Sequence, residues 1–339
     1  MRTAIILANV GTPEAPKVRK VYTYLTQFLN DPRVIDIPWL FRKLLVNLII
    51  IPFRVRNSTK LYKMLWTEKG SPLLYLSERL AGKLEARLGR DHKVFVAMRY
   101  GKPALKDVVQ QIKEGKFDEV VIVPMFPQYA SSTTGTATDE ILKQISKWNV
   151  IPSIRFMGQF YDHPAYLDAF LKQVSKYNLS DYDHFLFSYH GLPDRHVNKV
   201  HPTISVHNCN CEVTMPEHGA YCYKATCHET TRLLADQLKI AKSKYTVAFQ
   251  SRLDKNWLTP FSDKVIVDLA KSGKKKILVF APSFVTDCLE TIIEIGVEYE
   301  ELFKENGGET MQLAEVLNDS DIWAEGLREM ILGPSGKLI

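Results

Sequence analysis

The sequence lacks the signals of two common classes of protein. Its formal net charge is +6 and its pI is near 8.9, yet no dense run of Lys and Arg occurs along the chain. A mildly basic chain of this kind suits an anionic ligand or a membrane surface better than a nucleic acid. No G-x-G-x-x-G motif follows the first predicted strand, residues 4–8. Nicotinamide chemistry therefore loses its main support, because that motif forms the pyrophosphate site of dinucleotide-binding folds.

A secretory signal and a membrane-spanning segment are also missing. The first apolar stretch, residues 3–8, is too short for a signal peptide and has no cleavage-type tail. The apolar segment 39–51, WLFRKLLVNLIII, is too short and too interrupted by polar residues to span a bilayer. The chain also has an odd number of cysteines, five. Together these features predict a protein of the reducing cytoplasm.

An alternation of buried-strand and helix patterns runs through the chain and begins again near residue 151. The 339 residues are 45% apolar and 11% aromatic, which is enough for two globular domains. The pattern predicts an α/β fold of two similar halves, each a mostly parallel sheet flanked by helices, with a cleft between them. We expect one domain over 1–150 plus 311–339 and the other over 151–310. The expected strands are 4–8, 94–98, 120–125, 185–189, 246–249 and 277–280.

A line of acidic residues follows the last predicted strand. Thr286 is placed to cap a helix that opens with Asp287. Residues three or four positions apart share one side of an α-helix, so the acids form a single stripe. Such a stripe is either a solvated surface or a relay that carries protons or a divalent cation inward. The acids are Asp287, Glu290, Glu294, Glu298 and Glu301.

His190 is the residue that we pair with this acidic helix. It directly follows the predicted strand 185–189 and precedes a turn set by Gly191 and Pro193. An imidazole at the carboxyl end of a strand can accept a proton or bind a metal ion near neutral pH. A lone histidine is more often structural. His190 and Glu290 nevertheless follow two different strands, as the members of a catalytic pair in a cleft do.

Residues 38–53 can be interpreted in two ways. They are apolar nearly throughout, with Arg42, Lys43 and Asn47 on one narrow polar stripe. The segment is either a core helix or an amphipathic lip that lies in a membrane interface or at the entrance of an apolar pocket. Solvent exposure distinguishes the two interpretations.

Four of the cysteines lie close together in the sequence, in what looks like an insertion over residues 198–227. Their spacing is C-x-C-x10-C-x4-C. In a reducing compartment, clustered thiols indicate a metal centre rather than disulfides. Zinc and a [2Fe-2S] cluster both accept four thiolates, and a nearby histidine such as His201 or His218 could replace one of them. The four are Cys209, Cys211, Cys222 and Cys227.

Five further blocks are distinctive when they are taken together: LANVGTP at 7–13, FPQYASSTTG at 126–135, SYHGLP at 188–193, FQSRLDKNW at 249–257 and TDCLETIIE at 286–294. In this order and spacing they resemble the ferrochelatases, the enzymes that insert ferrous iron into a porphyrin at the end of haem synthesis. The match covers nearly the whole chain. Several blocks in family order are far more specific than any one of them.

The resemblance implies two Rossmann-like halves and a set of site residues. His190 and Glu290 match the family's metal-site histidine and glutamate, and Asp287 and Glu294 match its acidic helix, so these four are the predicted catalytic residues. Residues 39–51 match its apolar lip. Many members carry histidine where this chain has Cys288, so that position is given no role. The predicted substrate-binding residues are Arg99, Tyr100, Ser71, Tyr129, Gln250 and Trp257.

The resemblance predicts an enzyme that inserts Fe²⁺ into protoporphyrin IX to form haem. A free-base porphyrin must lose two pyrrole protons as iron enters, and His190 with the acidic stripe could accept them or deliver the cation. A chelatase for coproporphyrin III, or for cobalt and sirohydrochlorin, would use the same groups. A non-catalytic porphyrin carrier would need only the cleft. The apolar lip favours the more apolar protoporphyrin, and it predicts peripheral contact with the inner face of a membrane.

The resemblance also bears on the cysteines. Some ferrochelatases carry a [2Fe-2S] cluster, which favours that cluster over zinc or unligated thiols. The best-known arrangement uses a cysteine-rich C-terminal extension, whereas the cysteines of this chain lie in the predicted insertion. The cluster therefore rests on the chemistry of four thiols more than on matched positions.

Overall fold

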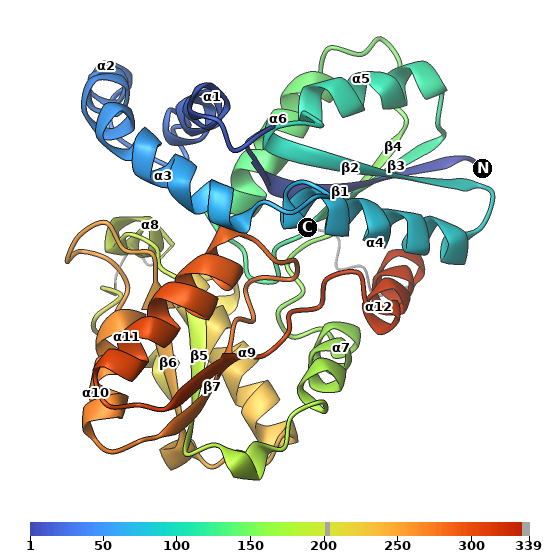
Figure 1. Cartoon of the computed structure of the whole chain (residues 1–339). Helices are drawn as coiled ribbons and strands as arrows, with labels where there is room; N and C mark the ends of the chain where they lie inside the picture. The colour runs from blue at the N-terminus through green and yellow to red at the C-terminus, as the bar shows by residue number, and fades with distance from the viewer. Residues whose placement is uncertain (201–203, 334–339) are drawn as a thin grey trace. The chain divides into compact units, whose positions relative to one another are not determined.

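The structure is a computed structural model that describes residues 1–200 and 204–333. The chain forms two compact units, one of Met1–Gln159 with the described residues from Asn318 onward, the other of Phe160–Leu317 (Figure 1). Each unit contains a sheet of four parallel strands with helices packed against it. The fold class predicted from the sequence is therefore confirmed.

The sheet of the first unit has the strand order β2-β1-β3-β4. β1 occupies the interior because its residues 4–8 are apolar and at most 1% exposed, as a parallel strand covered on both faces requires. The helices α5 and α6 pack against Ala4, Ile6 and Ala8 on one face, and α4 covers the other. The strands are β1 (Thr3–Thr12), β2 (His92–Gly101), β3 (Glu119–Pro124) and β4 (Ser153–Phe156).

Helices connect the successive strands of the first unit, as parallel strands require. The last helix, α12, packs beside α4. A π-helical turn, η2, leads into α6, so the hydroxyl-rich segment after β3 forms the start of a helix. The helical segments are α1 (Val18–Leu29), α2 (Trp39–Leu44), η1 (Leu45–Ile50), α3 (Ile51–Leu65), α4 (Pro72–Leu88), α5 (Leu105–Gly115), η2 (Ser131–Gly135), α6 (Thr136–Ile145) and α12 (Asp321–Leu332).

The second unit repeats this topology, with the strand order β6-β5-β7-β8. Its core is formed by apolar residues such as Leu186, Val279 and Phe303. The strands are β5 (His184–His190), β6 (Tyr245–Gln250), β7 (Lys276–Phe280) and β8 (Thr310–Leu313). The main helical segments are α7 (Pro164–Val174), α8 (Asp194–Asn198), α9 (Tyr223–Gln237), α10 (Ser262–Lys271), η7 (Glu290–Tyr299) and α11 (Glu300–Glu305).

The boundaries between the units differ from those expected from the sequence, at 150 and 310. β4 pairs with β3 and so belongs to the first unit. β8 pairs with β7 and so belongs to the second. Both are edge strands of four residues, and neither carries the long apolar run that identifies the interior strands. Short edge strands give a weak sequence signal, so the expected boundaries left β4 and most of β8 outside the units to which they belong.

The apolar segment 38–53 is exposed, so the interpretation as a core helix is wrong. Trp39 and Phe41 are each 64% exposed and Phe53 is 81% exposed. Arg42 and Asn47 of the predicted polar stripe face inward instead. The buried guanidinium of Arg42 donates to the backbone oxygen of Ile37 at 2.9 Å, and the Asn47 side chain accepts from Asn30 at 3.0 Å. We call α2, η1 and the first turn of α3 the lip. No helix in the described ranges is long and apolar enough to cross a membrane.

Candidate active site

His190 is the last residue of β5, and a neighbouring carbonyl fixes the tautomer of its ring. The ring Nδ1 lies 2.7 Å from the backbone oxygen of Gly191. A carbonyl oxygen only accepts hydrogen bonds, so Nδ1 carries the proton and Nε2 keeps a lone pair. Glycine is needed at 191, because a Cβ there would lie 2.7 Å from the backbone oxygen of Gln250. This arrangement gives Nε2 the character of a base or of a metal ligand.

The backbone of His190 is held on both sides by side chains. Its N–H donates to Oγ of Ser283 at 3.4 Å, and its carbonyl oxygen accepts from the hydroxyl of Tyr223 at 2.9 Å. Ser283 lies in the loop after β7, and Tyr223 is the first residue of α9. Neither residue lies in a sequence motif that indicates such a contact, so neither was among the predicted site residues.

Glu294 is the predicted acid with the most hydrogen bonds. Its carboxylate accepts from the N–H and the hydroxyl of Ser251 at 2.9 and 2.5 Å, and from the hydroxyl of Tyr299 at 2.9 Å. Burial raises the pKa of Glu294, and the charge of Glu290 raises it further, against the lowering effect of Ser251, Tyr299 and His190. The carboxylate of Glu294 therefore lies close enough to Glu290 and His190 for the charge of each to shift its pKa.

The helix that carries these acids differs from the predicted one. It begins at Leu289 rather than at Asp287, and it is π-helical over η7. The hydroxyl of Thr286 finds no hydrogen-bond partner in the described part of the chain, so it does not cap the helix as predicted. Asp287 lies before the helix, and its carboxylate accepts from the hydroxyl of Thr291 at 2.8 Å. π-Helical turns are rare and frequently occur at functional sites.

The predicted acidic stripe divides into two parts. Asp287, Glu290 and Glu294 are half-buried, whereas Glu298 and Glu301 are exposed. The outer two acids therefore form a solvated surface, which was the simpler of the two interpretations. The inner three have the burial that a proton or cation relay requires.

Ser251 adopts a backbone conformation that is unusual for a residue other than glycine. Its φ is +62°, in the left-handed region, directly after β6. The two hydrogen bonds from Ser251 to Glu294 hold it there. A strained residue held in this way is typical of functional sites. No sequence pattern predicted Ser251, because serine has no preference for this conformation.

Gln250 and Trp257 lie on either side of this loop and are buried. The Gln250 amide oxygen accepts from Oγ of Ser188 at 2.7 Å, and its amide nitrogen lies 3.5 Å from Glu294. Trp257 pairs with Pro193 in an isolated bridge. These contacts make both residues supports for the loop beside His190. Cys288 is buried, which raises the pKa of its thiol, and the charge of Glu290 raises it further, so this unassigned position borders the acids.

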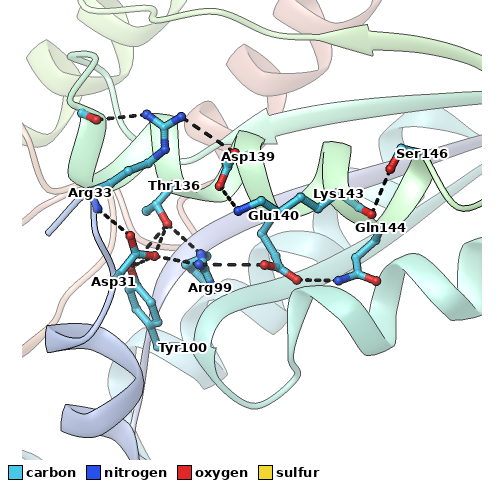
Figure 2. Close-up of polar contacts among 11 residues, drawn as sticks. Asp31, Arg33, Arg99, Tyr100, Thr136, Asp139, Glu140, Lys143, Gln144 and Ser146 are labelled. Carbon is cyan, nitrogen blue, oxygen red and sulfur yellow. Dashed lines mark hydrogen bonds and ion pairs between the residues drawn. The ribbon is translucent and has the colours of Figure 1, made fainter. Parts of the chain in front are cut away.

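In the first unit, Arg99 and Tyr100 converge on the buried carboxylate of Asp31 (Figure 2). Oδ2 of Asp31 accepts from Arg99 Nη2 at 2.7 Å and from the Tyr100 hydroxyl at 3.0 Å. It also accepts from Oγ1 of Thr136 at 2.7 Å, while Oδ1 accepts from the backbone N–H of Arg33 at 2.8 Å. Asp31 and Thr136 were missed from the sequence, because Asn30-Asp31-Pro32 indicates only a turn.

This network sets the chemical character of the two predicted substrate-binding residues. Burial raises the pKa of Tyr100, and the negative charge of Asp31 raises it further, so the phenol stays protonated at physiological pH. Arg99 lies with its guanidinium over the Tyr100 ring, 4.8 Å from the ring centroid. Arg99 and Tyr100 therefore act as fixed hydrogen-bond donors rather than as acids or bases.

A cavity of about 370 Å³ opens beside Arg99 and Tyr100 within the first unit. Its lining carries charges of both signs, with Lys20, Lys102 and Lys106 beside Glu14, Asp107 and Glu140. Ser71, by contrast, is buried and shares a hydrogen bond of 2.9 Å with Thr12. Tyr129 is half-buried in the loop after β3, where its N–H donates to the side chain of Gln159. The structure thus brings Arg99 and Tyr100 together with Asp31, but it places neither Ser71 nor Tyr129 on the cavity lining.

We expect Asp31→Asn to lower the free energy of unfolding by about 3 kcal/mol, because the part-buried Arg99 then relies on its longer contact with Glu140, at 3.9 Å. Urea denaturation measures the loss. Asp139→Asn is the matched control, since Asp139 pairs with Lys143 near the surface, and it should cost less than about 1 kcal/mol. Equal stability of Asp31→Asn and the wild type would show that the carboxylate charge is not needed.

The four clustered cysteines lie around the start of α9. The side chains of Cys211, Cys222 and Cys227 are fully buried, and that of Cys209 is half-buried. Burial raises the pKa of the Cys211 thiol to about 12, and it also raises the pKa values of Cys222 and Cys227. The charge of at least one other cysteine of the segment raises the pKa of each of these three thiols further, so the thiols lie near one another.

The cysteine-rich segment is not a preformed ligand set. Within residues 1–200 and 204–333, no group of three or more His, Cys, Asp or Glu is arranged to hold a metal ion. Nε2 of His218 lies 3.8 Å from Sγ of Cys209, whereas His201 lies outside the described residues. Arg232 anchors the segment by donating to the backbone oxygen of Cys211 at 3.0 Å. The donors suit a soft metal centre, although their present arrangement does not close around one.

The arrangement of two parallel sheets is that of the chelatase fold. The structure of SirB from Bacillus subtilis with Fe³⁺ matches with a TM-score of 0.57 and 11% identity, covering 100% of this chain and 99% of that chain. The sirohydrochlorin chelatase SirB from Bacillus subtilis subspecies spizizenii, in complex with cobalt, matches with a TM-score of 0.52 and 12% identity over 100% of this chain and 99% of that chain. At this level of identity the likeness establishes the fold alone.

Comparisons of sequence establish the family. The family model for ferrochelatase matches residues 2–333. A ferrochelatase of Legionella pneumophila (strain Lens) is 39% identical over 339 residues, which are 98% of this chain and 99% of that protein. A ferrochelatase of Coxiella burnetii (strain Dugway 5J108-111) is 40% identical over 334 residues, which are 97% of this chain and 93% of that protein. The chain belongs to the ferrochelatase family and is a metal-porphyrin chelatase, which confirms the resemblance seen in its sequence.

Proposed function

We propose that the chain inserts Fe²⁺ into protoporphyrin IX to form haem, with His190 as the base that accepts a pyrrole proton. The observation that carries this proposal is the bond between His190 Nδ1 and the Gly191 carbonyl, which leaves the lone pair on Nε2. Iron insertion releases two protons, one from each pyrrole N–H that Fe²⁺ replaces. A base beside the macrocycle is therefore needed at the moment when the metal enters.

The inner acids supply the second part of the mechanism. The pKa of Glu294 is raised, so it lies closer to neutral pH than the pKa of an ordinary glutamate. The carboxylate therefore exchanges protons more readily near neutral pH. We assign Glu290 to the transfer of protons or Fe²⁺ between His190 and this helix. Asp287 extends the same half-buried group.

We assign Arg99 and Tyr100 to binding of the porphyrin. Both are fixed by Asp31, which takes the only proton of Tyr100, so the remaining N–H groups of Arg99 are the donors that the pair can present. Arg99 and Lys106 in the lining of the neighbouring cavity suit the propionates that a protoporphyrin carries, whereas Lys20 and Lys102 pair there with Glu14 and Asp107. Direct substrate contact remains a prediction for Ser71, Tyr129, Gln250 and Trp257. Ser71 and Gln250 are hydrogen-bonded within the protein, and we assign these two mainly to positioning the loops around them.

An anaerobic assay that follows loss of the free-base porphyrin spectrum tests the substrate. With Fe²⁺ and protoporphyrin IX we expect turnover by the wild type, and slower turnover with coproporphyrin III because the lip is apolar. Insertion into coproporphyrin III alone, or of cobalt into sirohydrochlorin alone, would assign the chain to a different tetrapyrrole. Tight porphyrin binding without insertion of either metal would make it a carrier.

We propose that the lip lies in a membrane interface at the cytoplasmic face. Its apolar side chains point outward while Arg42 and Asn47 bond inward, to Ile37 and Asn30, which is the reverse of an ordinary surface helix. Exposed aromatic and aliphatic side chains next to the basic residues Lys43 and Arg54 suit an anionic lipid surface.

The double variant Phe41→Ser/Phe53→Ser should weaken binding to vesicles of anionic phospholipid by about tenfold or more, because each buried phenylalanine contributes roughly 1.5–3 kcal/mol. Co-sedimentation with the vesicles measures the loss. Val150→Ser is the control, because Val150 is an equally exposed apolar residue outside the lip, 83% exposed, and should leave binding unchanged. Unaltered vesicle binding by the double variant would instead assign the lip to the entrance of an apolar pocket.

We propose that the clustered cysteines hold a [2Fe-2S] cluster. Support comes from the donor set, since four thiols lie within one short segment and sense one another's charge. When bound, such a cluster supplies one-electron redox chemistry. The ligands would be Cys209, Cys211, Cys222 and Cys227.

Protein purified anaerobically should contain about two iron and two acid-labile sulfide per chain and absorb in the visible range. Cys222→Ser should lose both, whereas Cys288→Ser should keep both, because Cys288 is a buried cysteine outside the segment. Stoichiometric zinc without sulfide would identify a zinc site. Protein with neither metal would show that the thiols are unligated.

A further inference from the structure

Tyr223 lies between His190 and the cysteine-rich segment, and the proposed function does not use it. It follows Cys222 directly and is the first residue of α9. Its side chain is buried, at 7% exposure, and its hydroxyl donates to the backbone oxygen of His190 at 2.9 Å. A residue of the cysteine-rich segment thus bonds the residue that carries the proposed base.

The remaining contacts of the Tyr223 hydroxyl make this link more specific. The side chains of Ser283 and Cys227 also lie close enough to act on the pKa of Tyr223, which Ser283 lowers and Cys227 raises. Ser283 in turn accepts from the backbone N–H of His190 at 3.4 Å. A phenol has one proton, which Tyr223 donates to the His190 carbonyl oxygen, and its oxygen can still accept from Ser283. The N–H and C=O of His190 are therefore held by a connected set of side chains.

The thiols also define where α9 begins. The sulfur of Cys222 caps the helix by accepting from the backbone N–H of Ala225 at 3.4 Å. Cys227 lies one turn further along the same helix and is fully buried. Tyr223 is between them in sequence and shares their turn. A change in the position of the Cys222 sulfur therefore alters the cap of α9, directly beside Tyr223.

We propose that Tyr223 is a positioning residue that couples the cysteine-rich segment to His190. The bond from Tyr223 fixes the backbone carbonyl of His190. The position of the backbone in turn sets the direction of the imidazole ring, whose Nε2 is the proposed base. A displacement of about 1 Å at a reacting group can lower a rate about a hundredfold. The state of the thiols thereby controls the rate of iron insertion without contact with the substrate. The inference rests on the proposed role of His190 in insertion.

The first test is Tyr223→Phe, which removes the hydroxyl and keeps the ring. We expect kcat for Fe²⁺ insertion to fall about 10- to 100-fold, with KM for the porphyrin within about twofold of the wild type. Tyr189→Phe is the matched control. Tyr189 is also buried and also joins β5 to α9, through a bond of 2.8 Å to Thr231, but its hydroxyl does not bond the His190 backbone in the described structure. It should keep the wild-type kcat.

A second measurement reports on His190 without activity. In a ¹H–¹⁵N spectrum of protein with labelled histidine, the ring signals of His190 can be assigned by their loss in His190→Ala. These signals should shift in Tyr223→Phe and in Cys227→Ser, and they should stay in place in Tyr189→Phe. Cys227→Ser should also lower kcat in the wild-type background and have little further effect in the Tyr223→Phe background, because both changes act through the same bond.

The outcomes separate the inference from the proposed function. A wild type that inserts iron, with Tyr223→Phe showing the same kcat and unmoved His190 signals, would overturn the inference and leave the function in place. Equal losses from Cys227→Ser in both backgrounds would also overturn it, because the thiols would then act by another route. A wild type that inserts no iron would instead contradict the proposed function.

Discussion

His190→Ala should lower the rate of iron insertion by about 10²–10⁴-fold, the usual contribution of a positioned general base. Porphyrin binding should stay within about twofold, because alanine creates space without adding charge. The reason is specific to this site: the Gly191 carbonyl holds the proton on Nδ1, so Nε2 is the atom that accepts one. Single-turnover insertion under anaerobic conditions measures the rate, and quenching of protein fluorescence measures porphyrin affinity.

The matched control for this prediction is His184→Gln, at the opposite end of the same strand. Burial lowers the pKa of His184 to about 4, so this residue is neutral and serves as a hydrogen-bond partner of Thr246. Glutamine can replace that role, and insertion should be unchanged. If His190→Ala turned over near the wild-type rate, His190 would have no part in the chemistry.

Glu290→Gln should lower kcat by about a hundredfold while keeping the shape of the site, since the amide is nearly isosteric with the carboxylate. The substitution also removes a negative charge that raises the pKa of Glu294. The pKa of Glu294 should therefore fall. If the remaining activity of Glu290→Gln depends on ionised Glu294, the corresponding inflection in its pH–rate profile should lie at lower pH than in the wild type. The pH profile of insertion between about pH 5 and 9 tests both expectations.

Glu298→Gln controls for a change of charge on the same helix. Glu298 is exposed, and its replacement should leave both the rate and the pH profile unchanged. An equal loss in Glu298→Gln and Glu290→Gln would show that the net charge of the helix matters rather than the position of one carboxylate. Normal turnover by Glu290→Gln would remove Glu290 from the mechanism.

The interior of the fold was predictable because buried parallel strands leave a strong signal. Three interior strands, β1, β3 and β7, largely coincide with continuous apolar runs in the sequence, at residues 4–8, 120–125 and 277–280. The family was predictable for a different reason, since five blocks occur in a fixed order. Edge strands β4 and β8 gave little signal, because four residues at the border of a sheet need few apolar side chains.

The site was predictable only where its residues lie in those blocks. Glu290 and Glu294 were identified, but their π-helix was not, because the spacing of acids by three and four also fits an α-helix. Asp31 bonds Arg99 across 68 residues of sequence, and no local pattern records such a contact. Ser251 is held in a left-handed conformation by Glu294, so its geometry is a property of the folded loop and not of the serine itself.

The outward-facing apolar side of the lip has a consequence for kinetics. A protein bound to lipid through Phe41, Leu48 and Phe53 would meet a porphyrin that is already dissolved in the same bilayer. Encounter would then take place by lateral diffusion in two dimensions, and turnover would depend on the number of porphyrin molecules per unit of lipid area. Adding empty vesicles at constant porphyrin should therefore slow the enzyme by surface dilution, although the bulk concentration of every reactant stays the same.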